Sequence, residues 1–403
     1  MSFPAGSMAS KVGASRGDTV RACLVILALL FTVCNGDPPP PPPPPTCQAW
    51  GTFEGCECPV GTERADVLGV CAPPRVDRHI DLGAARGVTA FSLALRDVTY
   101  IKEFAYHIQR NSWNVMRVGA QTAHDWCAQS FPMELAESDL LMHMRAAGYL
   151  PCGPAHGTPQ WEANLNRLLD TTARVHNIGV QLIPTFTYKS HNECNQTEWR
   201  EDQEDCQAKN VIYFNKMFDR VNAVVKAGSY QHVVWDVFNE PVHPLNQHIK
   251  DEDVRAIMLH KKTQTTLPMG VDYHGGGEGE DWRGRYPYIW RDVSNYLAFH
   301  PPRNPTPSYA IMEAAQDKYN YVKPVWADET LCWASQKNID KYGLKGKGTI
   351  AMNGYGTEEQ RMDQVVKHLR DINRVGWSPT FHSIWGIECI ELGRLPKWED
   401  IVQ

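Results

Sequence analysis

The sequence lacks any excess of positive charge. Its 403 residues include 40 Lys and Arg against 46 Asp and Glu, for a formal net charge of −6, and the basic residues are scattered along the chain. Proteins that bind nucleic acids gather Lys and Arg into a patch or stripe that follows the phosphate backbone. No such stripe is present, so we exclude a nucleic acid as a partner.

The N-terminal apolar run is too short to span a bilayer comfortably. Leu24 to Val33 follows the basic residues Lys11, Arg16 and Arg21 and precedes polar residues 35–37, which is the pattern of a secretory signal. It also lacks an Ala-x-Ala cleavage site. Residues 1–36 are therefore either a cleaved signal peptide or an uncleaved signal anchor, and only the anchor would attach the protein to a membrane. Both interpretations predict a secreted or extracellular location.

A phosphate-binding loop is missing as well. The Gly-rich, acidic stretch 274–280 has no Lys at the required place and opens no helix, which excludes a nucleotide site of that type. The stretch continues into Trp282, Tyr286, Tyr288 and Trp290. Aromatic faces are natural platforms for sugar rings, so this segment suits glycan binding.

Cysteine, in contrast, is plentiful, and ten of the twelve Cys follow the signal region. Translocation would place these ten in an oxidising compartment, where the sequon 195–197 also fits. Segment 47–74 has almost no aliphatic content, so we predict that it folds through two disulfides of undetermined pairing. Residues 55–61 are similar to an epidermal-growth-factor module; a small carbohydrate-binding module around Trp50 and a cross-linked spacer are the alternatives. The four cysteines of this segment are Cys47, Cys56, Cys58 and Cys71.

The unbroken proline tract Pro38 to Pro45 separates this segment from the N-terminal region. Such a tract adopts an extended polyproline helix without burying a core. We interpret residues 37–46 as a stiff linker.

From residue 80 to the C-terminus, apolar strands alternate with amphipathic helices, which is typical of an α/β fold of the (β/α)8 TIM-barrel type. Few residues follow the eighth strand, so the last helix should be short or the barrel incomplete. Expected strands are 87–93, 115–119, 180–186, 232–239, 267–273, 296–300, 323–328 and 380–386; expected helices are 98–110, 161–175, 211–227, 251–261, 308–319 and one that Thr357 and Gln360 cap.

Two of these strands end in a glutamate. The stretch 232–241 delivers Glu240 after Asn239, and the stretch 323–329 delivers Glu329. Retaining glycosidases need two carboxylates about 5 to 5.5 Å apart, one as proton donor and base and the other as nucleophile. We predict that Glu240 is the acid and base and that Glu329 is the nucleophile, with no metal or organic cofactor.

Arg117 lies inside the otherwise apolar strand 115–119. A buried guanidinium is costly unless an acid pairs with it, so we expect a buried or substrate-facing carboxylate beside Arg117. Asp236, Asp328 and Glu388 are further acids near the two glutamates and are alternatives for their roles.

Asn239-Glu240-Pro241 and the later stretch 325–329 together resemble clan A of the glycoside hydrolases, closest to the family-five β-glycanases and β-mannanases. The resemblance covers roughly residues 85 to 390. It implies that Asn239 binds the sugar 2-hydroxyl, that Arg117 supports the nucleophile and that Trp385 lies under the sugar. His300 stands where this family has a His-x-Tyr motif, but Pro302 replaces the Tyr, so we assign the phenol to Tyr273.

Together these features predict a monomeric glycoside hydrolase that cleaves β-linked oligo- or polysaccharides. The alternative is a catalytically inactive barrel that binds glycans. The missing His-x-Tyr pattern keeps that alternative open, whereas both expected carboxylates being present favours the enzyme.

Overall fold

The structure is a computed structural model of the whole chain. It describes residues 44–76, 78–90, 93–120, 154, 157–184, 203–239, 251–273, 292–301, 323–328, 330, 336, 356–382 and 395–403. Two compact units are distinguished, Met1–Thr46 with Gly55–Glu57, and Cys47–Glu54 with Cys58–Gln403. In the first unit, the backbone N–H of Glu57 donates to the carbonyl of Pro45 (3.0 Å). Of the helices described, none combines the length and apolar character that crossing a membrane requires.

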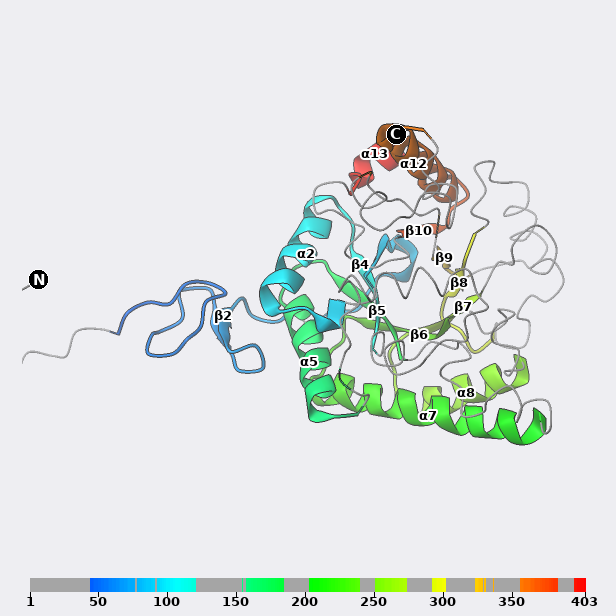
Figure 1. The fold of residues 1–403 in the computed structure, drawn as a ribbon, viewed down its shortest axis with the longest axis horizontal. Coiled ribbons are helices and arrows are strands. Elements are labelled where there is room, and N and C mark those ends of the chain that lie inside the picture. The colour runs from blue at the N-terminus through cyan, green and yellow to red at the C-terminus, as the bar shows by residue number, and fades with distance from the viewer. Residues whose placement is uncertain are drawn as a thin grey trace, which may run out of the picture. The chain divides into compact units, whose positions relative to one another are not determined.

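The second unit contains a closed barrel of eight parallel strands, which confirms the predicted (β/α)8 fold (Figure 1). Each strand pairs with its neighbour in the chain, and the last pairs with the first, so the sheet has no free edge. The barrel is complete. Its strands are β3 (Gly87–Thr89), β4 (Val115–Gly119), β5 (Gly179–Ile183), β6 (Val233–Asn239), β7 (Met269–Tyr273), β8 (Leu297–Phe299), β9 (Val325–Ala327) and β10 (Ser378–Phe381).

Helices follow the strands on the outside of the barrel (Figure 1). The predicted capping box is present: the side chain of Thr357 caps the backbone N–H of Gln360, and the Gln360 side chain accepts from the N–H of Thr357. The expected helix 308–319 lies outside the described residues. The helices are α2 (Val98–Arg110), α5 (Pro159–Ala173), α7 (Gln203–Ala227), α8 (Asp251–Gln264), α12 (Glu358–Arg374) and α13 (Trp398–Val402), with short 3-10 turns η1 (Leu82–Ala84) and η2 (Leu93–Leu95).

Several bounds differ from the sequence-based expectation, and the largest differences are in α7 and β10. Helix α7 begins at Gln203 rather than Val211, because residues 203–210 include good helix formers that the apolar periodicity does not reveal. Strand β10 covers Ser378–Phe381 rather than 380–386. The short final helix α13 confirms the expectation for the C-terminus.

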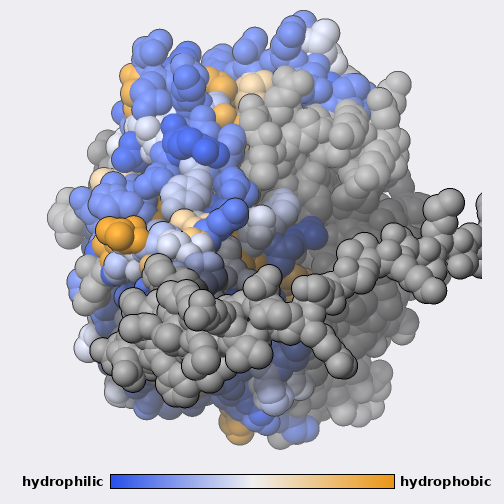
Figure 2. Space-filling model, turned by 90° about the vertical axis from the view of Figure 1, so that its left-hand side faces the viewer, coloured by the Kyte–Doolittle hydropathy of each residue, from blue (hydrophilic) through white to orange (hydrophobic). Residues whose placement is uncertain are grey.

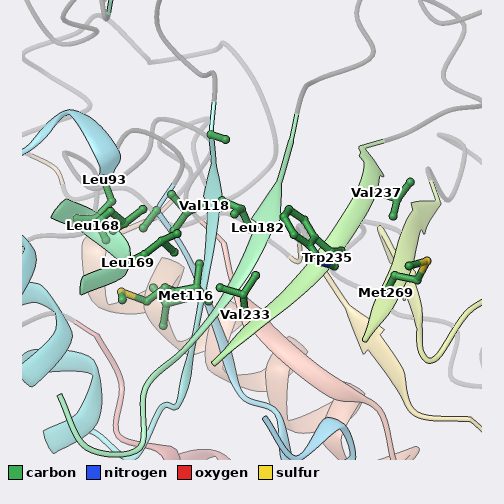
Figure 3. Packing of buried hydrophobic residues seen from close by; sticks show 14 of the residues in the cluster. Leu93, Met116, Val118, Leu168, Leu169, Leu182, Val233, Trp235, Val237 and Met269 are labelled. Carbon is green, nitrogen blue, oxygen red and sulfur yellow. The ribbon is translucent and has the colours of Figure 1, made fainter. Parts of the chain in front are cut away.

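The main hydrophobic core lies between the barrel and its helices. Met116, Val118 and Leu182 point outward from β4 and β5 toward the helix residues Leu168 and Leu169, and all five are buried (Figure 3). Burying a side chain of this size contributes about 1.5 to 3 kcal/mol. This apolar shell attaches the helices to the strands and leaves the opposite strand face free to point into the barrel.

The barrel interior nearer the amino ends of the strands is also apolar. The rings of Tyr296 and Trp326 lie 4.3 Å apart between centroids, beside Val115, Val234 and Ala298. Gly270 makes room for them, because a Cβ there would come within 2.6 Å of the Tyr296 ring. These side chains fill the barrel below the polar residues described in the next subsection.

The cysteine-rich segment forms a two-stranded antiparallel sheet, β1 (Glu63–Ala65) with β2 (Val70–Ala72). Its four cysteines are all in disulfides, as predicted, and Cys58 pairs with Cys71. Arg174, the C-cap residue of α5, donates to Glu63 Oε1 (2.8 Å) and to the Pro73 carbonyl (2.7 Å). Within the second unit, this sheet therefore packs against the barrel's helical layer.

The described surface visible in Figure 2 is mainly hydrophilic, with isolated hydrophobic residues. Single exposed hydrophobic side chains are normal on soluble domains. Among the described residues, the large hydrophobic side chains that are exposed are Val60, Val67, Ile212, Leu259 and Val402.

Candidate functional site

The polar interior of the barrel is built by alternation along the strands. On β4, Met116 and Val118 face the helices, so Arg117 between them faces inward, and its register partner Gln181 on β5 does the same. Asp272 on β7 and Asp328 directly after β9 follow the same rule. All four side chains are completely buried.

A register shift in β6 places a further polar residue inside. Val234 and Asp236 point inward at the regular spacing of two, but the pairing with β7 is irregular between Asp236 and Asn239. As a result Phe238 packs outward, with its ring 5.1 Å from that of Phe214 on α7, and Asn239 turns inward to Arg117. The bulge thus brings the residue just before Glu240 into the polar cluster.

Arg117 is the centre of this cluster. Its guanidinium donates to Asp236 Oδ2 from Nη2 (3.1 Å) and Nε (3.2 Å), and also from Nη2 to Asp272 Oδ2 and Asn239 Oδ1. Its Nε lies 3.7 Å from Asp328 Oδ2. The predicted pairing of Arg117 with a buried acid is confirmed, and the partner is a set of three carboxylates.

Three carboxylates around one guanidinium leave an excess of negative charge. Burial raises the pKa of Asp236 well above its usual range, Arg117 opposes this, and the neighbouring Asp272 and Asp328 add to it. Burial likewise raises the pKa of Asp272 to about 6, against the lowering effects of His300 and Arg117. The cluster therefore holds protons that isolated aspartates would release.

Asp328 is held by neutral donors. Gln181 Nε2 donates to its Oδ2 (2.6 Å), and Thr380 Oγ1 on β10 donates to its Oδ1 (2.8 Å). Both oxygens of the residue directly before Glu329 are therefore fixed by strands on either side of the barrel, and this carboxylate cannot swing freely.

His300, at the end of β8, points into the same cluster. Its Nε2 lies 2.6 Å from Asp272 Oδ2, and the ring is 3% exposed. His300 and Arg117 therefore share one oxygen of Asp272. The structure thus brings together three of the predicted site residues, Arg117, Asn239 and His300.

The other predicted site residues are Glu240, Glu329, Trp385 and Tyr273. The first three lie outside the described residues, and for Tyr273 only the backbone of β7 is described. Their roles stay predictions. Asp236 and Asp328, considered as alternatives to the two glutamates, are fully buried at the Arg117 cluster, and Glu388 lies outside the described residues.

Sequence analysis missed Asp272 and Gln181. The signal that identified Arg117, a polar residue inside an apolar strand, applies to both: Gln181 interrupts the strand 179–183, and Asp272 follows Val271 in β7. Applied to every strand, this rule predicts the polar interior, although it does not say which side chains meet.

Oxygens of Asp236, Asp272 and Asp328 lie within 4.8 Å of one another, as in many cation sites. The guanidinium of Arg117, however, already contacts all three. It supplies the positive charge that a metal ion would otherwise bring, so the arrangement fits an arginine-centred cluster.

A cavity of about 340 Å³ lies at the other end of the barrel, lined by Ser229 and Tyr230 before β6 and by Leu267 before β7. In (β/α)8 enzymes the active site is at the carboxyl ends of the strands. This cavity is at the amino ends, so we do not assign the site to it.

No protein-family model matches the chain, and no curated protein matches it either. Solved structures with a similar arrangement include a β-1,4-mannanase of glycoside hydrolase family 113 (8% identity, 75% of this chain and 88% of that chain, TM-score 0.45). An endo-1,4-β-D-mannanase from Thermotoga petrophila is similar over 74% of this chain and 87% of that chain (10% identity, TM-score 0.46). A family 5 mannosidase from Rhizomucor miehei is similar over 75% and 84% (11% identity, TM-score 0.48).

Proposed function

We propose that the protein is a retaining glycoside hydrolase that acts on β-linked glycans. The observation that carries this proposal is the convergence of Asn239 and Asp328 on Arg117. These residues directly precede Glu240 and Glu329 in the chain. Two strands far apart in sequence therefore bring the backbone before each glutamate to the same end of one barrel, where (β/α)8 enzymes place their active sites.

In the proposed reaction, the Glu329 carboxylate attacks the anomeric carbon while Glu240 gives its proton to the glycosidic oxygen, so the glycosidic bond breaks as the glycosyl-enzyme ester forms. Glu240, now ionised, takes a proton from water. That water attacks the anomeric carbon and releases Glu329, with net retention of configuration. Asn239 is expected to hydrogen-bond the 2-hydroxyl of the sugar.

The buried cluster would support this chemistry electrostatically. Arg117 is fixed by at least two carboxylates and by Asn239, and Asp328 by Gln181 and Thr380. A charged group held in a dry site needs little reorganisation when charge moves in the transition state. The same rigidity would hold the two glutamate backbones at a fixed spacing.

The test is hydrolysis of β-mannan, β-glucan and xylan by the wild type and by Glu240→Gln and Glu329→Gln. We expect reducing ends from at least one glycan, and a loss of about 10³-fold or more in each variant. Azide should restore activity to Glu240→Gln with an activated substrate, because azide needs no general base. Asp219→Asn, an exposed carboxylate on α7, is the control.

The second candidate, a glycan-binding barrel without catalysis, is favoured by the replacement of the His-x-Tyr tyrosine by Pro302. It predicts binding to a glycan without new reducing ends in the wild type and in both Gln variants. That result would overturn the hydrolase proposal.

A further inference from the structure

Asp272 joins two polar residues that come from different strands. Its Oδ2 lies 2.6 Å from His300 Nε2 and also accepts from Arg117 Nη2. Its Oδ1 has no hydrogen-bond partner among the residues that the structure describes. One oxygen of a fully buried carboxylate therefore fixes both an imidazole ring and a guanidinium.

The charges around Asp272 favour a proton on His300 Nε2, between the ring and the Asp272 carboxylate. Facing it are Arg117 from β4, Asp236 from β6, Tyr296 before β8, His300 after β8 and Asp328 after β9. Arg117 is the only one of these groups that is always a cation, against three carboxylates. A proton held between His300 and Asp272 offsets the remaining negative charge and keeps the ring nitrogen and the carboxylate oxygen hydrogen-bonded.

A carboxylate that receives the N–H of a histidine sets the tautomer and the orientation of the ring. His300 is the residue that the sequence places at the carboxyl end of its strand, where substrates bind. Asp272 is completely buried, and its Oδ2 contacts His300 and Arg117, so we expect it to act through these two residues.

We propose that Asp272 is a positioning residue of the active site, which holds His300 with its proton on Nε2 and holds Arg117 against Asn239. The inference rests on the proposed function, in which Asn239 bonds the sugar, and on the sequence-based prediction that His300 is a substrate-binding residue. It goes further by assigning a role to Asp272, a carboxylate that is not among the predicted site residues.

The structure supplies a matched control. Asp236 is also fully buried, and its Oδ2 also bonds Arg117, with two contacts, but its Oδ1 has no hydrogen-bond partner among the described residues, so it does not hold the His300 ring. Asp272→Asn and Asp236→Asn therefore each replace a buried carboxyl group that bonds the same guanidinium with an amide, and only Asp272→Asn alters the partner of the ring. A role limited to stability would affect both variants alike.

The first measurement is ¹⁵N NMR of the full chain labelled at histidine, with the His300 signals assigned by their loss in His300→Gln. In the wild type we expect the neutral ring to carry its proton on Nε2. In Asp272→Asn the tautomer should become mixed and the titration midpoint should move to lower pH, because a neutral amide no longer favours the imidazolium. Asp236→Asn should retain the wild-type tautomer. An unchanged tautomer in Asp272→Asn, or equal changes in both variants, would overturn the proposal.

The second measurement is kcat/KM on the glycan that the wild type cleaves. Asp272→Asn should lower it about 10- to 100-fold, the usual effect of losing a carboxylate that orients a functional histidine. In a His300→Gln background the further loss should be much smaller, because the two residues act as a unit. Full additivity would contradict the assignment. If no glycan is cleaved, the hydrolase proposal fails, while the NMR comparison still decides whether Asp272 orients His300.

Discussion

The two faces of the barrel strands have opposite chemistry. The outer face packs Met116, Val118 and Leu182 against the helices without a charge, whereas one residue away, on the inner face, Arg117 and Gln181 belong to a buried polar cluster. The outer face holds the helices to the strands through buried apolar surface area alone. The inner face depends on charge balance, and two of its residues, Asn239 and Asp328, directly precede Glu240 and Glu329 in the chain.

This difference predicts that the stability effect of a substitution depends on pH on the inner face and does not on the outer face. Removing Arg117 should have the largest effect. Arg117→Met leaves Asp236, Asp272 and Asp328 without their cation, and loss of one partner of a buried ion pair costs about 3 to 5 kcal/mol. We expect a fall of this size in the free energy of unfolding at pH 8, measured by urea denaturation.

The same variant should lose less stability at pH 5. The pKa of Asp272 is already about 6, above its unfolded value, so the native state takes up a proton as the pH falls through that range. Without Arg117 the carboxylates should protonate at still higher pH. Arg255→Met, which removes an exposed pair with Asp292, is the control and should cost less than about 1 kcal/mol. An effect of Arg117→Met that does not depend on pH would contradict the charge-balance argument.

Leu168→Ala tests the outer face. Leu168 is fully buried between α5 and the barrel, and truncation of such a leucine costs about 2 to 5 kcal/mol through lost contacts and the cavity left behind. The loss should be equal at pH 5 and pH 8, because no ionisable group is removed. Leu259→Ala, at an exposed position on α8, should change stability by less than about 0.5 kcal/mol.

Lys261 is an exception to the contrast, since it places a cation in the apolar shell. Its Nζ lies 4.4 Å from the ring centre of Phe218 and 5.3 Å from that of Phe238, and it is 1% exposed. Burial lowers the pKa of Lys261 to about 7, with Asp219 and Asp236 opposing. Lys261→Met should therefore stabilise the protein at pH 6 by about 1 to 3 kcal/mol, since it removes a charge that is expensive to bury.

The gain in the free energy of unfolding from Lys261→Met should shrink as the pH rises from 7 toward 10. The folded pKa is below the unfolded value of about 10.5, so the unfolded chain binds more protons in this window and wild-type stability recovers with pH. Lys262→Met, the exposed neighbour, is the matched control. A gain from Lys261→Met that stayed constant with pH would show that the aromatic rings fully compensate the charge.

How much of the fold and of the candidate site could be predicted depends on how far apart in the sequence the interacting residues are. Periodicity located α2 at Val98–Arg110 and β4 at Val115–Gly119 with the observed bounds, and the cap at Thr357 followed from a Thr and a Gln three positions apart. The polar first turns of α7 were missed because propensity without an apolar stripe gives a weak signal. The need of Arg117 for an acid was clear, but not that three would surround it.

By itself the sequence determined the alternation of strands and helices, and with it a closed barrel whose polar strand residues must face inward, because a strand has a period of two and each helix an apolar face. Only the tertiary structure decided which side chains meet there. The stagger between strands set Asp272 beside both Arg117 and His300, and an irregular pairing in β6 turned Asn239 inward. Such contacts depend on register between strands up to 155 residues apart, which no local pattern specifies.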